Sequence, residues 1–268
     1  MRTPLPWNSI RAVSIDHLGN NYGIPPDGLS DAGDTRINLK HSRYYAMNAA
    51  TCLRETPRAR TAVISGDFAD LARIYQPDVN LCLIRREPEP AIGRFVGQLL
   101  NQGAQIESSQ ALSFEHFDFS SLLPEYRELE GHDSWWRDIA RLTAAFCDLF
   151  ETGSVGLRLR TLNQAMCPRF HVDFVPCRLV CTYGGRGTEW LADDEVDRSK
   201  LGLAGSKGLP DEDSGLILGS VRAMPAYAVA LMKGATWEGR DYPGAVHRSP
   251  RPSLEQPRRL LLTLDLLQ

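Results

Sequence analysis

The chain has 268 residues, of which 43% are hydrophobic and 24% charged, a balance typical of a globular protein that buries a core. A formal net charge of −3 excludes the strong positive field of a nucleic-acid-binding protein. No apolar run reaches the roughly 18–20 residues of a membrane-spanning helix, and the N-terminal stretch lacks the apolar region of a secretory signal. We therefore expect a cytoplasmic protein that binds neither nucleic acid nor membrane.

Residues 1–56 are rich in Gly, Pro, Asn and Asp and show no sustained hydrophobic periodicity. We predict an irregular N-terminal arm here. Met47 is a candidate start of the native protein, because recognisable order begins only after it.

Residues 57–153 combine strand and helix patterns, and we predict an α/β helical buttress. An apolar run over 79–87 indicates a strand, and apolar residues at spacings of three and four indicate a helix over 90–103. The strongest helix pattern covers 133–153. Its predicted apolar stripe consists of Trp136, Ile139, Leu142, Phe146 and Phe150.

After residue 153 the pattern changes to short alternating runs separated by Gly, Pro or Asp, which is typical of strands in a barrel or sandwich. We therefore predict a β core over residues 154–268 and an α+β fold for the whole chain. A polar, glycine-rich segment at 197–215 interrupts this core and is a candidate lid.

The stretch CPRFHVDFVPC, residues 167–177, places His171 and Asp173 two residues apart. On a strand such residues share a face, so an imidazole and a carboxylate would project together. His247 in AVHRSP is the candidate third ligand. Two histidines and one carboxylate form the facial triad of non-haem Fe(II) oxygenases, and Zn²⁺ could use the same ligands. The alternative is that His171 only pairs with Asp173, and that His247 is a loop residue.

Arginines near these residues are candidates for anion binding. Arg259 and Thr263 lie four residues apart on one face of a predicted strand whose other face is leucine. The planar fork of an arginine suits a carboxylate, so Arg259 facing a cavity would bind one. A shift of one residue would turn Arg258 inward instead, and an arginine at a solvent-exposed edge is also open. Arg178 has the opposite parity to its apolar neighbours and is expected to face outward.

Three cysteines flank the candidate ligands. Cys177 and Cys181 share the strand parity of His171 and Asp173 if Pro176 introduces no bulge. The alternative is therefore a His/Cys zinc site drawn from Cys167, His171, Cys177, Cys181 and His247. Structural zinc prefers thiolates on a turn, however, and buried thiols are the other interpretation.

The order of these residues resembles that of the Fe(II)- and 2-oxoglutarate-dependent oxygenases. The resemblance covers roughly residues 155–266. It implies a double-stranded β-helix, a jelly-roll relative of the cupins, as the metal-binding core over 154–268.

Residue by residue, the resemblance implies that His171, Asp173 and His247 hold Fe(II). It implies that Arg259 with Thr263 holds the distal carboxylate of 2-oxoglutarate. The protein would then be an enzyme that oxidises a second substrate, a small molecule or a peptide, which the sequence does not name.

The phrases CPRFHVD, RLVCTYGGRGTEWL, LMKG and AVHRSP are also similar to a bacterial family known only as a domain of unknown function. Its members often occur among genes of zinc homeostasis. This second resemblance implies an alternative, a non-catalytic cupin-like metal-binding protein that is an accessory in zinc homeostasis. Arg259 discriminates between the two, because a metal store has no need of a buried guanidinium beside its site.

Overall fold

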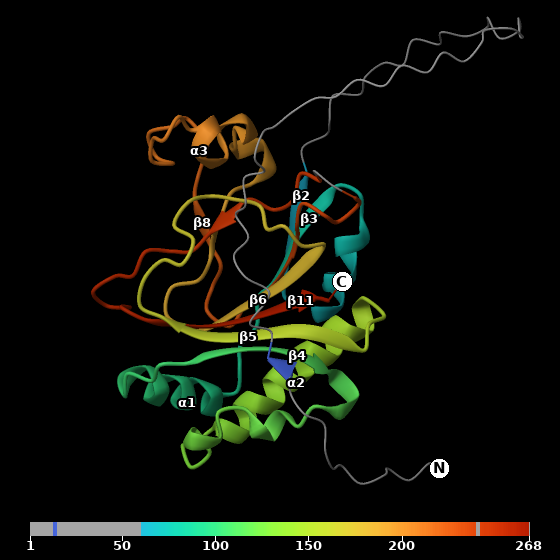
Figure 1. The fold of residues 1–268 in the computed structure, drawn as a ribbon, viewed down its shortest axis with the longest axis vertical. Coiled ribbons are helices and arrows are strands. Elements are labelled where there is room, and N and C mark those ends of the chain that lie inside the picture. Colours follow the sequence, from blue (N-terminus) through green and yellow to red (C-terminus); the bar gives the residue numbers. More distant parts are fainter. Residues whose placement is uncertain (1–12, 15–59, 240–241, 268) are drawn as a thin grey trace, which may run out of the picture. The chain divides into compact units, whose positions relative to one another are not determined.

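The computed structural model describes residues 13–14, 60–239 and 242–267 (Figure 1). Of the irregular arm predicted over 1–56, only the short strand β1 (Val13–Ser14) lies in this part of the chain. The rest of that arm and the candidate start Met47 lie outside the described residues.

A sheet of eight strands, in the order β1-β4-β5-β11-β6-β9-β3-β2, forms the centre of the fold. Neighbouring strands are antiparallel except for the parallel pair β2 and β3. In chain order the other strands are β2 (Thr61–Ser65), β3 (Val79–Ile84), β4 (Glu107–Ser113), β5 (Ser154–Leu162), β6 (Cys177–Gly184), β9 (Val229–Lys233) and β11 (Arg259–Leu266).

A second, three-stranded sheet has the order β10-β7-β8. Its strands are β7 (Glu189–Trp190), β8 (Arg222–Ala223) and β10 (His247–Arg248), each of two residues. Isolated bridges join His171 to His247 and Val196 to Ile217. We call this layer the small sheet.

Two long helices, α1 (Pro90–Asn101) and α2 (His132–Leu149), lie beside each other below β4 and β5 in Figure 1. The short helix α3 (Gly202–Gly205) lies at the opposite end, near β8. The described residues also contain six 3-10 helices: η1 (Phe68–Tyr75), η2 (Phe114–His116), η3 (Phe119–Ser121), η4 (Pro124–Tyr126), η5 (Asp193–Glu195) and η6 (Arg198–Lys200). None of the helices in the described ranges is sufficiently long and apolar to cross a bilayer.

Both long helices follow their sequence signals. Proline occupies the first turn of α1, where its missing N–H costs nothing, and Gly103 follows the helix with φ +74°. In α2 the middle of the predicted stripe is buried, at Ile139, Leu142 and Phe146. Its two ends, Trp136 and Phe150, are only half-buried, and the buried indole at the start is that of Trp135. These helices cover one face of the large sheet.

Strand β11 shows how the two faces of the large sheet differ. Leu260, Leu262 and Leu264 belong to the apolar cluster that the sheet shares with α1 and α2. Leu261 belongs to a second cluster, which includes Trp190 of the small sheet. Because strand residues alternate in direction, the other residues with the parity of Leu261 point to the small sheet.

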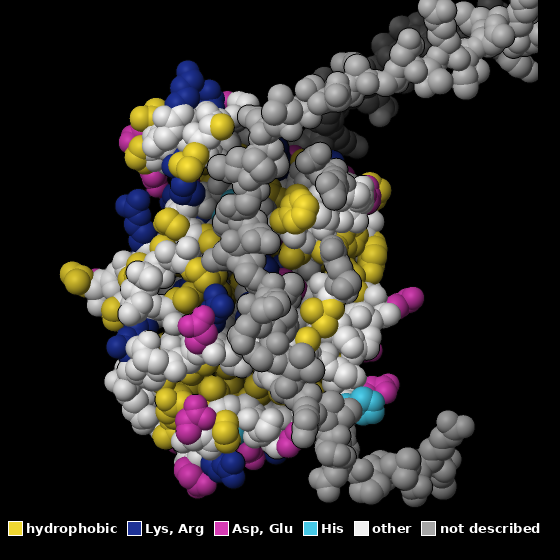
Figure 2. Space-filling model, in the orientation of Figure 1, with side chains coloured by type: hydrophobic (Ala, Val, Ile, Leu, Met, Phe, Trp, Pro, Cys, Tyr) yellow, Lys and Arg dark blue, Asp and Glu magenta, His cyan; other side chains and the backbone are white. Residues whose placement is uncertain are grey.

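The chain is a mixed α/β protein with one large sheet and few helices. Strands β2, β3 and β4 precede residue 153 and join the same sheet as the strands that follow it. The division into a buttress over 57–153 and a core over 154–268 stays a prediction. On the face shown in Figure 2, Lys and Arg side chains are interspersed with Asp and Glu and form no single large patch.

Candidate metal centre

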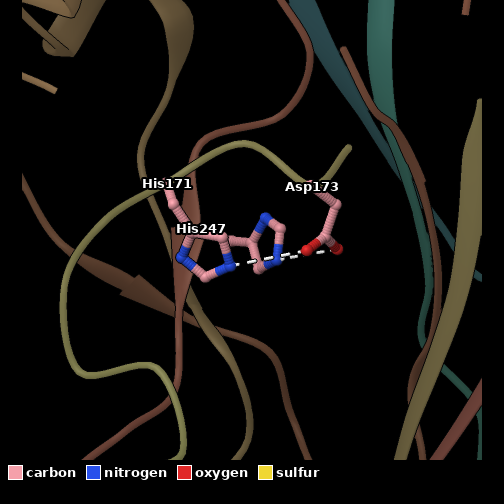
Figure 3. Close-up of side chains that lie close together, drawn as sticks. All are labelled: His171, Asp173 and His247. Atoms are coloured by element: carbon pink, nitrogen blue, oxygen red, sulfur yellow. Dashed lines mark ion pairs between the residues drawn. The ribbon is translucent and has the colours of Figure 1, made fainter. Parts of the chain in front are cut away.

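His171, Asp173 and His247 converge on one point (Figure 3). The Nε2 atom of His171 lies 3.4 Å from Oδ1 of Asp173, and the Nε2 atom of His247 lies 3.2 Å from Oδ2. One ligand atom from each of the three residues lies within 4.8 Å of the others. The structure therefore brings together all three residues that the sequence nominated as metal ligands.

Backbone pairing holds the two histidines side by side. His171 and His247 exchange two backbone N–H···O=C hydrogen bonds, each of 3.0 Å, and their ring centroids lie 4.6 Å apart. His247 opens β10, whereas His171 belongs to an isolated bridge and Asp173 lies in the irregular chain after it. The predicted juxtaposition occurs, although the segment is not the continuous strand from which it was inferred.

The orientation of both rings is set by backbone carbonyls. Nδ1 of His171 lies 2.9 Å from the carbonyl oxygen of Arg169, and Nδ1 of His247 lies 3.0 Å from that of Ala245. A carbonyl only accepts, so each Nδ1 carries the hydrogen and donates it. In the neutral rings this leaves the Nε2 lone pairs directed at Asp173, the arrangement by which proteins present imidazole to a metal.

The charges around Asp173 keep it ionised. Burial alone would raise the pKa of this carboxyl, but the neighbouring His247, Arg178 and His171 hold it well below its ordinary value. Two Nε2 lone pairs that face a carboxylate are favourable only if a cation lies among them. That cation is either a proton on each ring or a metal ion, and the three donors suit Fe(II) or Zn²⁺.

Arg178 corrects one sequence expectation, because it does not face outward. Its Nη1 donates to Oδ2 of Asp173 at 2.8 Å, and its Nε and Nη2 donate to Asp265 at 2.6 and 2.9 Å. Arg158 of β5 also pairs with Asp265. The parity assigned to Arg178 was right, but that face of the sheet is covered by the small sheet and is not solvent.

Arg259 lies on the same face as Arg178, and its side chain is turned inward, since the residue is 6% exposed. Its Nη2 donates to Oγ of Ser249 at 3.2 Å, and Nη1 has a long contact of 3.5 Å with Oγ1 of Thr188. No carboxylate in the described part of the chain lies within ion-pair distance of it. Burial lowers the pKa of the Arg259 guanidinium to about 10, so it remains charged at neutral pH. A buried charge without a counterion is costly, and an anion bound beside Arg259 would offset that cost.

The register question is answered by the neighbour of Arg259. Arg258 has the opposite parity, and its Nη1 lies so close to Gly103, after helix α1, that a Cβ there would come within 2.8 Å. Thr263 is half-buried on the Arg259 face, opposite Val180 of β6. The inward arginine is therefore Arg259.

A short path of contacts links Arg259 to the histidines. Ser249, which holds the guanidinium, comes two residues after His247, and its N–H donates to the carbonyl of Cys167 at 2.9 Å. Burial raises the pKa of the Cys167 thiol, with opposing influences from Asp173 and Arg259. Cys167 therefore lies near both groups.

The zinc alternative that used cysteines fails for two of them. Cys177 and Cys181 are buried in the apolar cluster on the helix side of the sheet, away from Asp173. Burial raises the pKa of Cys181 to about 12, as expected for an inert thiol. Their parity with His171 was wrong because the chain between His171 and β6 is irregular, and strand parity does not carry across it.

Fold and site together define a mixed α/β protein with a candidate His-Asp-His metal centre. The model of the family described as "Protein of unknown function (DUF1826)" matches residues 65–265, and the chain belongs to this family. No curated protein gives a significant match.

Solved structures with detectable similarity include three associated with oxygenases. A proposed oxygenase from Shewanella oneidensis has 11% identity and a TM-score of 0.43, covering 78% of this chain and 89% of that one. A proposed 2OG-Fe(II) oxygenase family protein from Caulobacter crescentus has 12% identity and a TM-score of 0.38, with coverage of 78% and 86%. A Pseudomonas putida prolyl-4-hydroxylase has 12% identity and a TM-score of 0.37, with coverage of 74% and 96%. Similarity this low carries no argument about the chemistry of this chain.

Proposed function

We propose that the chain is an Fe(II)- and 2-oxoglutarate-dependent oxygenase whose large and small sheets form a double-stranded β-helix. The observation that carries the proposal is the buried guanidinium of Arg259, which has hydroxyl partners but no carboxylate among the described residues. It is joined through Ser249 to the segment of His247. A charged anion acceptor beside a His-Asp-His cluster is what a metal enzyme with an anionic co-substrate requires.

In this proposal His171, Asp173 and His247 would hold Fe(II), and Arg259 with Thr263 would hold the distal carboxylate of 2-oxoglutarate. Together the bound metal and co-substrate supply the oxidising chemistry that protein side chains lack. The chain itself binds, orients and excludes water. The second substrate is a small molecule or a peptide.

Arg178 has a defined part in this arrangement. Its hydrogen bond occupies Oδ2 of Asp173 and fixes the plane of the carboxylate, which leaves Oδ1 as the oxygen for a metal. Asp265 in turn holds the guanidinium of Arg178 from the neighbouring strand β11. An outer layer of this kind orients a ligand and keeps it ionised.

The second candidate is a non-catalytic, cupin-like metal-binding protein that acts as an accessory in zinc homeostasis. The orientation of the two imidazoles favours it as much as it favours the oxygenase, because Zn²⁺ accepts the same donors. It leaves Arg259 without a purpose. The two candidates therefore differ in whether Arg259 matters for ligand binding.

The test is an anaerobic Fe(II) titration with and without 2-oxoglutarate, followed by the visible metal-to-ligand charge-transfer band. We expect a band that His171→Ala abolishes and Arg259→Ala weakens. Arg258→Ala is the matched control, because it removes the neighbouring guanidinium on the other side of the sheet. If no band forms, while Zn²⁺ binds through His171 and Arg259→Ala has no effect, the metal-binding accessory is the better description.

A further inference from the structure

Asp211 is a buried carboxylate in the segment predicted as a lid, 41 residues after Phe170 in the chain. Its Oδ2 accepts a hydrogen bond of 2.6 Å from the backbone N–H of Phe170. Its Oδ1 lies 3.4 Å from Nη2 of Arg169, and Oδ2 lies 3.7 Å from Nη1 of Arg248. The Asp211 carboxylate thus binds the two residues that precede His171 in the chain.

The N–H of Phe170 and the carbonyl of Arg169 belong to the same peptide group. That carbonyl accepts the hydrogen bond from Nδ1 of His171, at 2.9 Å. One peptide plane therefore connects the carboxylate of Asp211 on one side with the imidazole of His171 on the other. It is the carboxylate–histidine pairing found around metals, with a peptide group inserted between the two.

His247 provides an internal comparison. Its Nδ1 also donates to the carbonyl two residues before it, that of Ala245, at 3.0 Å. Within the described ranges, no carboxylate accepts from the N–H of Val246, the other end of that peptide group. The two histidines therefore have the same local geometry but differ in whether an anion stands behind the carbonyl.

We propose that Asp211 is a positioning residue for the metal centre, which fixes and polarises His171 through the Arg169–Phe170 peptide group. An anionic acceptor on the N–H increases the negative charge on the carbonyl of the same group, and linked hydrogen bonds strengthen one another by about 10–30% each. The carbonyl then holds Nδ1–H of His171 more firmly. The ring is kept in the orientation that directs Nε2 to Asp173, and the Nε2 lone pair becomes a stronger electron donor to a metal ion.

Other side-chain contacts hold the same segment in place and have no part in the proposed relay. Ser206 and the carbonyl of Leu209 accept from Nη2 of Arg169 at 2.7 and 2.8 Å, and Glu212 accepts from Nη1 of Arg248 at 2.8 Å. These contacts hold the segment but do not touch the Arg169–Phe170 peptide group. They supply controls that separate the relay from general attachment.

The first experiment needs no variant and no metal. Long-range ¹H–¹⁵N correlation spectra of the metal-free protein report the Nδ1–H of both rings, which is present whether or not Nε2 is protonated. We expect the Nδ1–H proton of His171 to resonate further downfield than that of His247, and the amide proton of Phe170 to be strongly downfield. Equal shifts for the two rings, or a His171 ring without Nδ1–H, overturn the relay.

The second experiment compares Asp211→Asn with Glu212→Gln. Each removes one negative charge, from adjacent positions, but only Asp211 contacts the peptide group. Asp211→Asn is expected to shift the ring signals of His171, to leave those of His247 in place, and to weaken binding of Zn²⁺ in calorimetry. The expected loss is about tenfold, the low end of the range of about 10–100-fold for outer partners of metal ligands. Glu212→Gln is expected to change neither.

Equal effects of the two variants, or no effect of Asp211→Asn, would contradict the inference. The inference rests on the proposed metal site only in its calorimetric arm. If the unaltered protein binds no Zn²⁺ through His171, the proposed function fails, while the ring signals still decide whether Asp211 acts on His171. If Asp211→Asn does not fold, the comparison of the two rings in the unaltered protein decides the matter alone.

Discussion

Two arginines on opposite faces of the large sheet, the half-buried Arg86 and the buried Arg259, have opposite surroundings. On the helix side, Arg86 donates two hydrogen bonds to Asp138, at 2.5 and 2.7 Å, and a third to the carbonyl of Tyr227 at 2.8 Å. Tyr183 donates to the same carboxylate at 2.6 Å. On the small-sheet side, Arg259 has two hydroxyl contacts of 3.2 and 3.5 Å.

The comparison separates a charge whose counterion lies in the chain from a charge that has no counterion among the described residues. Burial acts to lower the pKa of Arg86, but its bonds to Asp138 more than compensate and raise it. For Arg259 the effect of burial is opposed only weakly, by Cys167, and the pKa of the guanidinium falls to about 10. A guanidinium with all its partners in the chain stabilises the fold, whereas one without a counterion costs stability and attracts an anion.

The largest expected effect is on stability, and it tests the comparison of Arg86 with Arg259 directly. Arg86→Ala removes the counterion of the buried Asp138, which keeps only the hydrogen bond from Tyr183. We expect a loss of about 3 kcal/mol in the free energy of unfolding, the low end of the range for a broken buried pair. Arg259→Met removes a charge that has no counterion, so we expect neutral or increased stability. Denaturant unfolding measures both. As a control, Arg94→Ala breaks an exposed pair with Glu130 and should cost at most about 1 kcal/mol.

An Arg259→Met variant that is as destabilised as Arg86→Ala would show that Arg259 is structural. The proposal of a co-substrate site would then lose its main support. The opposite outcome, a stable Arg259→Met protein that no longer responds to 2-oxoglutarate, would place this charge among the groups retained for binding at a cost in stability.

A second prediction concerns alkaline pH and the helix-side face. Burial, with contributions from Cys181 and Asp138, raises the pKa of Tyr183 well above its ordinary value, and burial raises the pKa of Cys181 to about 12. A raised pKa stabilises the fold below the unfolded value, and that stability is lost as pH rises toward the folded value. We expect the free energy of unfolding to fall above about pH 8.5, the ordinary value of a thiol.

Each such group contributes a slope of about 1.4 kcal/mol per pH unit between its two pKa values. Cys181→Ala removes one contribution, so urea unfolding measured between neutral and alkaline pH should show a shallower decline for this variant. An unchanged slope would mean that the thiol is accessible to water, and that the helix-side face is less tightly packed than described.

Sequence patterns were informative where one strand was long and regular. The alternation in β11 placed Arg259 and Thr263 on one face, and the leucines of the strand divide between the two apolar clusters as a period of two requires. The spacing of His171 and Asp173 also predicted that these two side chains lie close together, because residues two apart remain neighbours even in an irregular segment. These inferences needed only local geometry.

The sequence predictions that were wrong or missing have a common physical reason. They concern side chains whose partners lie far away in the chain. The sequence does not say that the small sheet covers the face of Arg178, and Asp265 lies 87 residues from it. Cys177 was placed with His171 because parity was carried across an irregular segment. Asp138 pairs with Arg86 from 52 residues away. An aspartate on the leucine-rich strand β11 was the one available signal for a buried ionic network.

The smallest predicted effect sharpens the account of Arg259. Ser249→Ala removes the better of its two hydroxyl contacts without changing any charge. One hydrogen bond to a buried group is worth about 1 kcal/mol, so we expect 2-oxoglutarate to bind about fivefold more weakly in an anaerobic titration with Fe(II) present. Thr263→Val tests the other proposed contact of the co-substrate, and its packing volume is nearly unchanged. Weaker metal binding in Ser249→Ala before any 2-oxoglutarate is added would instead assign Ser249 to support of His247. If only binding of the co-substrate is affected, the Ser249 hydroxyl orients Arg259 for an anion. Arg259 then differs from Arg86, whose counterion Asp138 lies in the chain.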